Sequence, residues 1–145
     1  MSENALVHKE VFRLMCEEQI GSGMSRTVWV SPLLPGRVVK TEEDSRRFQN
    51  VFEWETWNQV KDTKWAKWFA PCVSISPCGA VLVMERTTLP TLKQFPDRMP
   101  VFLTDFKRGN YGMLKGRLVC HDYGTNVLMQ TGLNDRVKKV GWWDS

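Results

Sequence analysis

The stretch Leu103-Thr-Asp-Phe-Lys-Arg-Gly-Asn110 places an aspartate and an asparagine five residues apart in a predicted loop, with Lys107 two residues after Asp105. Eleven residues beyond Asn110, the chain reads His121-Asp-Tyr-Gly124, which places Asp122 twelve residues after Asn110. Asp and Asn are common turn residues, so any one of these positions could serve only a turn. Their combined spacing is nevertheless the sharpest signal of a functional site in this sequence.

A short hairpin is predicted between these two segments. Met113-Leu114 and Leu118-Val-Cys120 flank Lys115-Gly116, which suits a tight turn. Asn110 and Asp122 would then arrive from opposite ends of one hairpin. Their oxygens suit a hard cation such as Mg²⁺, and Asp105 would be free to orient a nucleophilic hydroxyl.

A pair of glycines opens the preceding half of the chain, in Ile20-Gly-Ser-Gly-Met-Ser-Arg-Thr-Val-Trp29. The pattern predicts a strand, a turn and a second strand. Backbone N–H groups of Gly21, Ser22 and Gly23 could approach phosphates without interference from Cβ atoms. A plain turn explains the pair equally well. A dinucleotide fingerprint is disfavoured, because Arg26 stands at the third glycine position and a strand follows.

Lys40 ends a predicted strand over residues 37–40, where it must reach solvent or meet an anionic partner. A helix is predicted over residues 44–61, with an apolar face of Phe48, Val51, Phe52, Trp57 and Val60. Glu53 lies four and seven residues before Trp57 and Val60, which places it on the same inward face. The spacing therefore suggests an ion pair with Lys40; the alternative is a partly exposed Glu on the helix flank.

Two further strands are predicted at residues 71–75 and 80–85, joined by Pro77-Cys-Gly79. The second is an apolar run that would line the base of a cleft, with Met84 and Glu85 at its exit. Another short helix is predicted over residues 4–18. The predicted class is thus α+β, with a five-stranded antiparallel sheet, one helix and a small, irregular second lobe.

Composition limits the functions further. The chain has 145 residues, of which 42% are hydrophobic and 25% charged, and its mean hydropathy is -0.35. No apolar run approaches the roughly 18 residues that span a bilayer, and no secretory signal is recognisable, so a cytosolic protein is expected. The four cysteines are scattered, which favours free thiols over a zinc site. The net charge of +4 suits an anionic ligand, while the scattered basic residues disfavour nucleic acid as a partner.

Taken in order, these features resemble those of a Ser/Thr protein kinase reduced to its minimum. The resemblance implies that ATP and Mg²⁺ are the cofactors. It also implies that Gly21, Ser22 and Gly23 cover the phosphates and that Glu53 supports Lys40 on the α- and β-phosphates. The resemblance further implies that Met84, Glu85 and Thr87 lie at the cleft and hinge and contact the nucleotide. Asp105 and Lys107 would be catalytic. Asn110 and Asp122 would bind magnesium.

Several departures from the family weaken part of this expectation. Arg26 replaces a glycine, and Thr104 precedes Asp105 where the family often has arginine. Residues 87–104 are too few for the usual long helix, and only 21 residues follow Gly124, too few for a full activation segment. Nucleotide binding therefore follows from the resemblance better than peptide phosphorylation does. Such compactness resembles kinase-like proteins of phages and mobile elements.

Two functions stay open at this point. One is an ATP- and magnesium-dependent phosphotransferase acting on a protein hydroxyl or a small molecule. The other is a pseudokinase-like protein that grips and regulates a host protein, which a tryptophan-rich surface (Trp65, Trp68, Trp142 and Trp143) would favour. We expect one domain over residues 1–145, with lobes of about 1–86 and 87–145. A homo-oligomer or protein partner could cover apolar surface on the small lobe.

Overall fold

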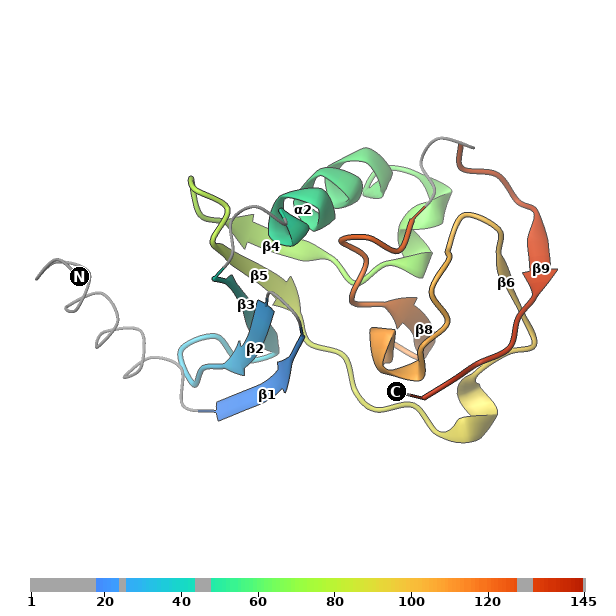
Figure 1. Cartoon of the computed structure of the whole chain (residues 1–145), viewed down its shortest axis with the longest axis horizontal. Helices are drawn as coiled ribbons and strands as arrows, with labels where there is room; N and C mark the ends of the chain where they lie inside the picture. Colours follow the sequence, from blue (N-terminus) through green and yellow to red (C-terminus); the bar gives the residue numbers. More distant parts are fainter. Residues whose placement is uncertain (1–17, 24–25, 44–47, 128–131, 145) are drawn as a thin grey trace, which may run out of the picture.

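Five strands form one antiparallel sheet in the order β1-β2-β3-β5-β4 (Figure 1). The computed structural model describes residues 18–23, 26–43, 48–127 and 132–144. The helix predicted over residues 4–18 lies outside them except for Glu18, which begins β1. The strands are β1 (Glu18–Ser22), β2 (Arg26–Val30), β3 (Arg37–Glu42), β4 (Cys72–Ile75) and β5 (Val81–Glu85).

The central strand β3 connects the sheet to the core. It pairs with β2 on one side and β5 on the other, with Lys40 opposite Val28 and Leu82. The β-branched residues of these strands suit a pleated surface with one face covered. On β5, Leu82 and Met84 are completely buried, and the residues between and beside them are partly exposed. This alternation directs the apolar face of the sheet toward α2 and the second lobe.

Helix α2 (Gln49–Val60) lies across the sheet (Figure 1). As predicted, Glu53 and Val60 are buried and Glu55 is exposed. The prediction of an apolar inward face was wrong at Phe48 and Phe52, which are 52% and 47% exposed. The inward positions near the start of α2 instead hold polar residues, because this end of the helix packs on charged side chains of the sheet.

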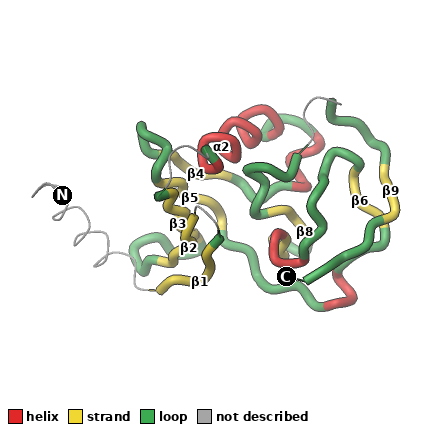
Figure 2. Tube along the Cα trace, viewed as in Figure 1, coloured by secondary structure: helices red, strands yellow, loops and turns green. Residues whose placement is uncertain are grey.

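The second lobe is formed mostly by loops and short elements (Figure 2). The hairpin of β7 (Tyr111–Leu114) and β8 (Arg117–Cys120) is present as predicted. Its turn residues Lys115 and Gly116 have φ values of 51° and 78°, as a two-residue hairpin turn requires. The other elements are the 3-10 helices η1 (Lys64–Trp68), η2 (Leu92–Gln94) and η3 (Arg108–Asn110) and the strands β6 (Arg98–Pro100) and β9 (Val137–Lys139).

One continuous core joins the sheet to the second lobe. Phe69 stacks on Phe102 and meets Tyr123 edge-on, with ring centroids 6.0 and 5.0 Å apart. Trp65, Trp68 and Trp142 pack against this core, so three of the four tryptophans expected at the surface contribute to packing. The exception is Trp143, which is 47% exposed. The α+β class, with a five-stranded antiparallel sheet, one α-helix and a small second lobe, is thus confirmed for the described residues. No helix in the described ranges is long and apolar enough to cross a membrane.

Candidate functional site

A cavity of about 810 Å³ lies between the sheet and the second lobe. Nine of the twelve predicted site residues line it: Gly21, Ser22, Gly23, Lys40, Glu85, Thr87, Lys107, Asn110 and Asp122. The other three do not. Glu53 lies behind Lys40, Met84 is completely buried in the core, and Asp105 lies outside the lining. Segments distant in the sequence therefore meet around one cavity, largely as their spacing predicted.

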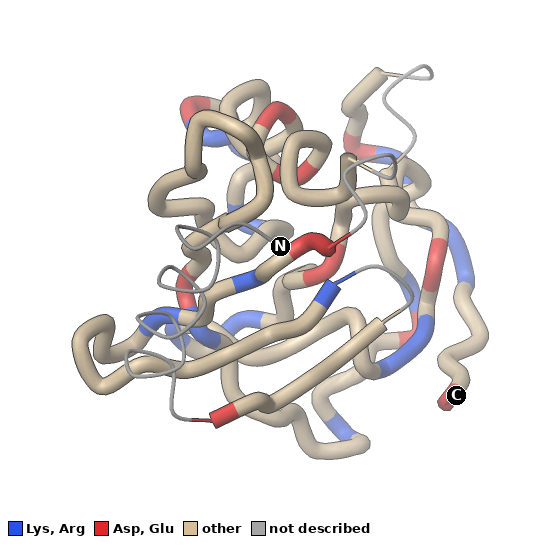
Figure 3. Tube along the Cα trace, turned by 60° about the vertical axis from the view of Figure 1, so that its left-hand side comes forward, with Lys and Arg blue, Asp and Glu red and all other residues tan. Residues whose placement is uncertain are grey.

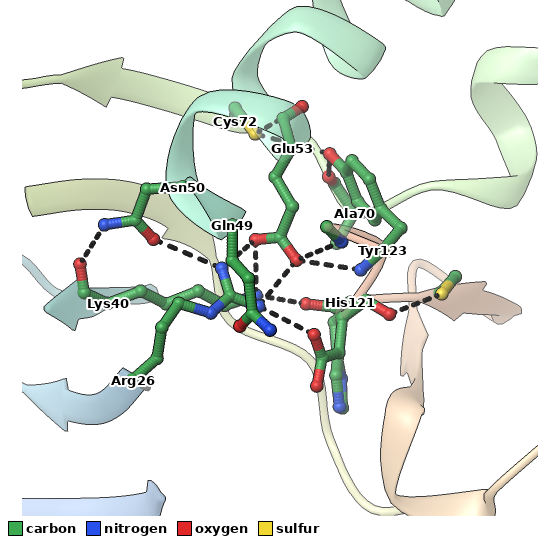
Figure 4. Close-up of polar contacts among 12 residues, drawn as sticks. Arg26, Lys40, Gln49, Asn50, Glu53, Ala70, Cys72, His121 and Tyr123 are labelled. Atoms are coloured by element: carbon green, nitrogen blue, oxygen red, sulfur yellow. Dashed lines mark hydrogen bonds and ion pairs between the residues drawn. The ribbon is translucent and has the colours of Figure 1, made fainter. Parts of the chain in front are cut away.

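Glu53 is the polar centre of the site (Figure 4). Its carboxylate is fully buried and lies 2.9 Å from the Lys40 ammonium, which confirms the predicted ion pair. The other carboxylate oxygen accepts hydrogen bonds from the backbone N–H groups of Tyr123 and Gly124, at 2.8 and 3.0 Å. One side chain of α2 thus holds the sheet and the His121–Gly124 segment together.

The surroundings of Glu53 favour its charged form. Burial alone would raise its pKa, but the ion pairs and hydrogen bonds with Lys40 and Arg26 outweigh that effect and lower the pKa to about 2. Lys40 also donates a hydrogen bond to the His121 carbonyl oxygen. Its ammonium is therefore held between α2 and the end of β8.

Arg26 is the main functional residue that the sequence analysis missed. It begins β2 and is 6% exposed. Its guanidinium binds both oxygens of Glu53, at 2.7 and 2.8 Å, and one oxygen of Asp122 at 2.6 Å. These partners hold the pKa of Arg26 above its ordinary value, although burial alone would lower it. The only signal in the sequence was an arginine at the third position of the glycine pattern that begins at Gly21.

Two more polar side chains position α2 on the sheet. Glu42, at the end of β3, accepts hydrogen bonds from the backbone N–H groups of Gln49 and Asn50, at 2.8 and 2.9 Å. These donors belong to the first turn of the helix, where N–H groups have no partner within the helix. Asn50 is completely buried; it accepts from Arg26 and donates to the Lys40 and Gly79 carbonyl oxygens. Neither contact was predictable from periodicity.

His121 links the segment after β5 to the loop before β7. Its Nε2 lies 2.7 Å from the Gly109 carbonyl oxygen, and its Nδ1 lies 2.7 Å from the Thr87 hydroxyl. A carbonyl only accepts, so Nε2 carries the proton and Nδ1 accepts from Thr87 when the ring is neutral. Burial, followed by the nearby Lys40 charge, lowers the pKa of His121. The ring is therefore held neutral at the cavity wall.

The Asp105 side chain contacts its own loop and does not line the cavity. Its carboxylate accepts a hydrogen bond from the Lys107 backbone N–H at 3.2 Å. The buried Asn126 accepts from the backbone N–H groups of Thr104 and Asp105 and donates to the Asp105 carbonyl oxygen. This single amide holds a loop for which the sequence offered no supporting helix.

The C-terminal residues of the described chain also reach the site. The Trp143 backbone N–H donates to the Phe106 carbonyl oxygen at 3.2 Å, and the Arg108 N–H donates to the Trp143 carbonyl oxygen at 2.8 Å. Asp144 then forms an ion pair of 3.0 Å with Arg108 and lines the cavity. No motif marked this segment, because its contribution depends on contacts with a loop more than 30 residues away.

The predicted magnesium ligands meet only in part. Asn110 and Asp122 both line the cavity, and the His121 N–H donates to the Asn110 carbonyl oxygen at 2.9 Å. Arg26, however, already binds the Asp122 carboxylate. Within the described ranges, no group of three or more His, Cys, Asp or Glu side chains could hold a metal ion. Arg26 thus occupies one carboxylate oxygen of Asp122, and magnesium binding by Asn110 and Asp122 stays a prediction.

Charge around the cavity is mixed. Five lining residues are Lys or Arg and three are Asp or Glu, so the lining has a small positive excess. Along the coloured part of the chain, basic and acidic positions are interspersed over several elements (Figure 3). A modestly cationic cavity suits a small anionic ligand.

Comparison with known proteins gives little further information. No protein-family model matches the chain, and no curated protein matches it. Seven chains of solved structures match. One is a ternary complex of streptomycin, ATP and APH(2″)-IIa, with a TM-score of 0.44 and 17% sequence identity. The match covers 63% of this chain and 30% of the other, so this chain spans less than a third of that protein's length.

Proposed function

We propose that the cavity binds ATP and that the protein is a kinase-like phosphotransferase acting on a hydroxyl of a protein or small molecule. The observation that carries this proposal is the buried Lys40–Glu53 ion pair of 2.9 Å at the cavity wall. A lysine held in this way presents a fixed positive charge to a phosphate chain. Gly21 and Ser22 at the end of β1, and Gly23 after it, line the same cavity.

The lining suggests how the ligand would lie. The adenine would occupy the side formed by residues 85–88, and the phosphates would extend toward Lys40 beneath Gly21, Ser22 and Gly23. Phosphoryl transfer requires mainly positioning and charge stabilisation. Lys107, which lines the cavity, would stabilise the transferred group, and Asp105 would turn toward the cavity to orient the hydroxyl.

The test of ATP binding is calorimetric titration of ATP into the full chain and into Lys40→Ala. Loss of Lys40 leaves Glu53 with one cationic partner fewer and removes the phosphate contact, so we expect at least about tenfold weaker binding. Lys64→Ala is the matched control, because it breaks a 2.6 Å ion pair with Asp135 at an exposed surface. No saturable binding of ATP to the wild-type chain would contradict the proposal.

Catalysis is tested separately with γ-labelled ATP and Asp105→Asn. A phosphotransferase should release or transfer the label, and the variant should lose turnover while keeping ATP affinity, because Asp105 lies outside the cavity lining. Equal turnover in both proteins would exclude Asp105 as the catalytic aspartate.

A second candidate is a pseudokinase-like protein that binds nucleotide and regulates a protein target without catalysis. The orientation of Asp105 favours it, since this carboxylate accepts from its own loop. Saturable ATP binding without any labelled product would support this candidate over the first. A phage or mobile-element origin stays a prediction from compactness alone.

We also propose a cytosolic location, where ATP is available. Cys72, Cys78 and Cys120 are free thiols, which suits a reducing compartment; the prediction that such thiols are buried holds for Cys72 and Cys120 and was wrong for Cys78, which is exposed. Burial raises the pKa of Cys72 to about 12, which keeps this thiol protonated and unreactive.

A further inference from the structure

The Asp122 carboxylate, the predicted magnesium ligand, has a cationic partner within the protein. Arg26 Nη2 lies 2.6 Å from Asp122 Oδ1, and the same nitrogen lies 2.8 Å from Glu53 Oε2. Arg26 is 6% exposed, whereas the Asp122 side chain is 50% exposed. The guanidinium therefore approaches Asp122 from the protein interior and covers one of its carboxylate oxygens.

The contact between Arg26 and Asp122 matters because it changes the net charge around Asp122. Lys40, Glu53 and Asp122 alone would carry one positive and two negative charges, and this excess would attract a cation. Arg26 adds the missing positive charge, so the four side chains are neutral together. A divalent ion placed at Asp122 would then lie close to the Arg26 guanidinium. Repulsion between the two cations opposes its binding.

Arg26 is also difficult to displace. It donates to both oxygens of Glu53 in a bidentate arrangement and to Asn50 at 3.1 Å. Such paired contacts are stronger than single hydrogen bonds. Moving the guanidinium aside would leave the fully buried Glu53 with Lys40 as its only cationic side-chain partner among the described residues, which is costly.

We propose that Arg26 takes the place of a divalent cation at Asp122, so that this site binds ATP without Mg²⁺. The proposal rests on the proposed nucleotide site and deepens it. Arg86, Lys107 and Arg108 also line the cavity and supply positive charge for the phosphates. Arg26 acts as a positioning residue that neutralises Asp122 and holds it against α2.

The first experiment uses the wild-type chain alone. ATP is titrated calorimetrically once in EDTA and once with excess MgCl₂, and Mn²⁺ binding without nucleotide is followed by electron paramagnetic resonance. We expect the two dissociation constants to agree within about threefold and no Mn²⁺ site to appear. ATP binding that requires Mg²⁺, or a stoichiometric Mn²⁺ site lost in Asp122→Asn, would overturn the proposal.

Two variants separate the role of Arg26 from a general loss of structure. Arg26→Gln should weaken ATP binding in EDTA by at least about tenfold, and Mg²⁺ should restore part of it, because Asp122 becomes free to hold a cation. Arg117→Gln removes an exposed arginine of β8 outside the cavity and is the matched control. Unchanged EDTA affinity in folded Arg26→Gln would overturn the proposal.

If Arg26→Gln does not fold, the variant Asp122→Asn tests the proposal instead. If Arg26 is the cation, removing the Asp122 charge should leave ATP affinity equal or tighter in both buffers. If Asp122 holds Mg²⁺, the variant should lose binding in MgCl₂, which overturns the proposal. Absence of ATP binding to the wild-type chain in either buffer would instead reject the proposed function itself.

Discussion

At the residue scale, the buried charges explain how the site is held together. Glu53 has two cationic partners and two backbone donors, drawn from three segments of the chain. Burying such a carboxylate is unfavourable unless every partner remains in place, and losing one partner of a buried pair typically costs about 3–5 kcal/mol. The network therefore fixes the positions of the Lys40 and Arg26 side chains.

His121 makes stability depend on pH. Its pKa is lowered in the folded protein by burial and by Lys40, while Asp122 and Glu53 act in the opposite direction. The unfolded chain therefore takes up a proton first as pH falls below 6.5, its ordinary value. The free energy of unfolding should decrease from pH 7.5 toward pH 5.5, because the unfolded state binds more protons in that range.

Urea unfolding at several pH values measures this effect. His121→Gln should remove the decrease, whereas His8→Gln, at the other histidine of the sequence, should keep it. Glu53 does not interfere, since stability linked to its lowered pKa is lost only as pH falls below 4.5 toward 2. A decrease that persists in His121→Gln would assign the effect to another group.

The predictability of individual residues follows from what each one contacts. The Lys40–Glu53 pair was predicted from the helical period of α2 and from a strand expected to end at Lys40, although β3 continues to Glu42. Asn110 and Asp122 could be placed together because a short hairpin connects them. Arg26, Asn50 and Asn126 could not, since each takes its role from partners far along the chain. A polar residue in a strand or loop gives no signal of such contacts.

At the scale of elements, the β7–β8 hairpin packs unusually close to the segment that follows β5. Thr88 exchanges backbone hydrogen bonds with Met113, at 2.9 and 2.8 Å. A Cβ atom at Gly112 would lie 2.0 Å from Thr87 Oγ1 and 3.0 Å from His121 Nδ1. Glycine is therefore required here for close approach rather than for its backbone angles.

Gly112→Ala should destabilise the protein by about 1–3 kcal/mol, because the hairpin must move away from Thr87 and His121. Gly141→Ala is the control, since a Cβ there would meet no atom within 4 Å, and its effect should stay within about 0.5 kcal/mol. Chemical denaturation of both variants measures the difference. Equal stability of the two would show that the hairpin shifts without cost.

The helices and strands differ in how readily they can be predicted from the sequence. The strands of the sheet are β-branched and apolar runs separated by glycine and proline, so their number and order were predictable. The β6–β9 pair was missed, because each strand has three residues and their partners lie about 40 positions apart. Helix α2 was found, but its inward face was assigned by hydrophobicity, and Phe48 and Phe52 were misplaced.

At the scale of the whole molecule, the sheet and the second lobe share one core and one polar network. Neither part keeps its interior covered without the other, since Phe69, Phe102 and Tyr123 pack across the boundary. One domain over residues 1–145 stays a prediction. Leu89 and Leu92 line the cavity and are 95% and 76% exposed. A homo-oligomer or a protein partner that covers such apolar surface stays a prediction.

Thermal unfolding should accordingly be a single transition. Far-ultraviolet circular dichroism reports the sheet and helix, and tryptophan fluorescence reports both parts of the molecule, so their midpoints should coincide. Saturating ATP should raise both midpoints together, because it binds the folded state alone. Two separate midpoints would instead show that the lobes unfold independently.

The contact of Glu42 with the first turn of α2 has a consequence for regulation. Together with Asn50 and Glu53, it fastens the helix to β3 at two successive turns. Swinging α2 outward would leave these charges and amides without partners, which is costly, so we expect α2 to stay on β3 when a ligand binds. Residues 86–92 and 143–144, in contrast, are exposed or partly so, and an effector bound there would meet no such penalty.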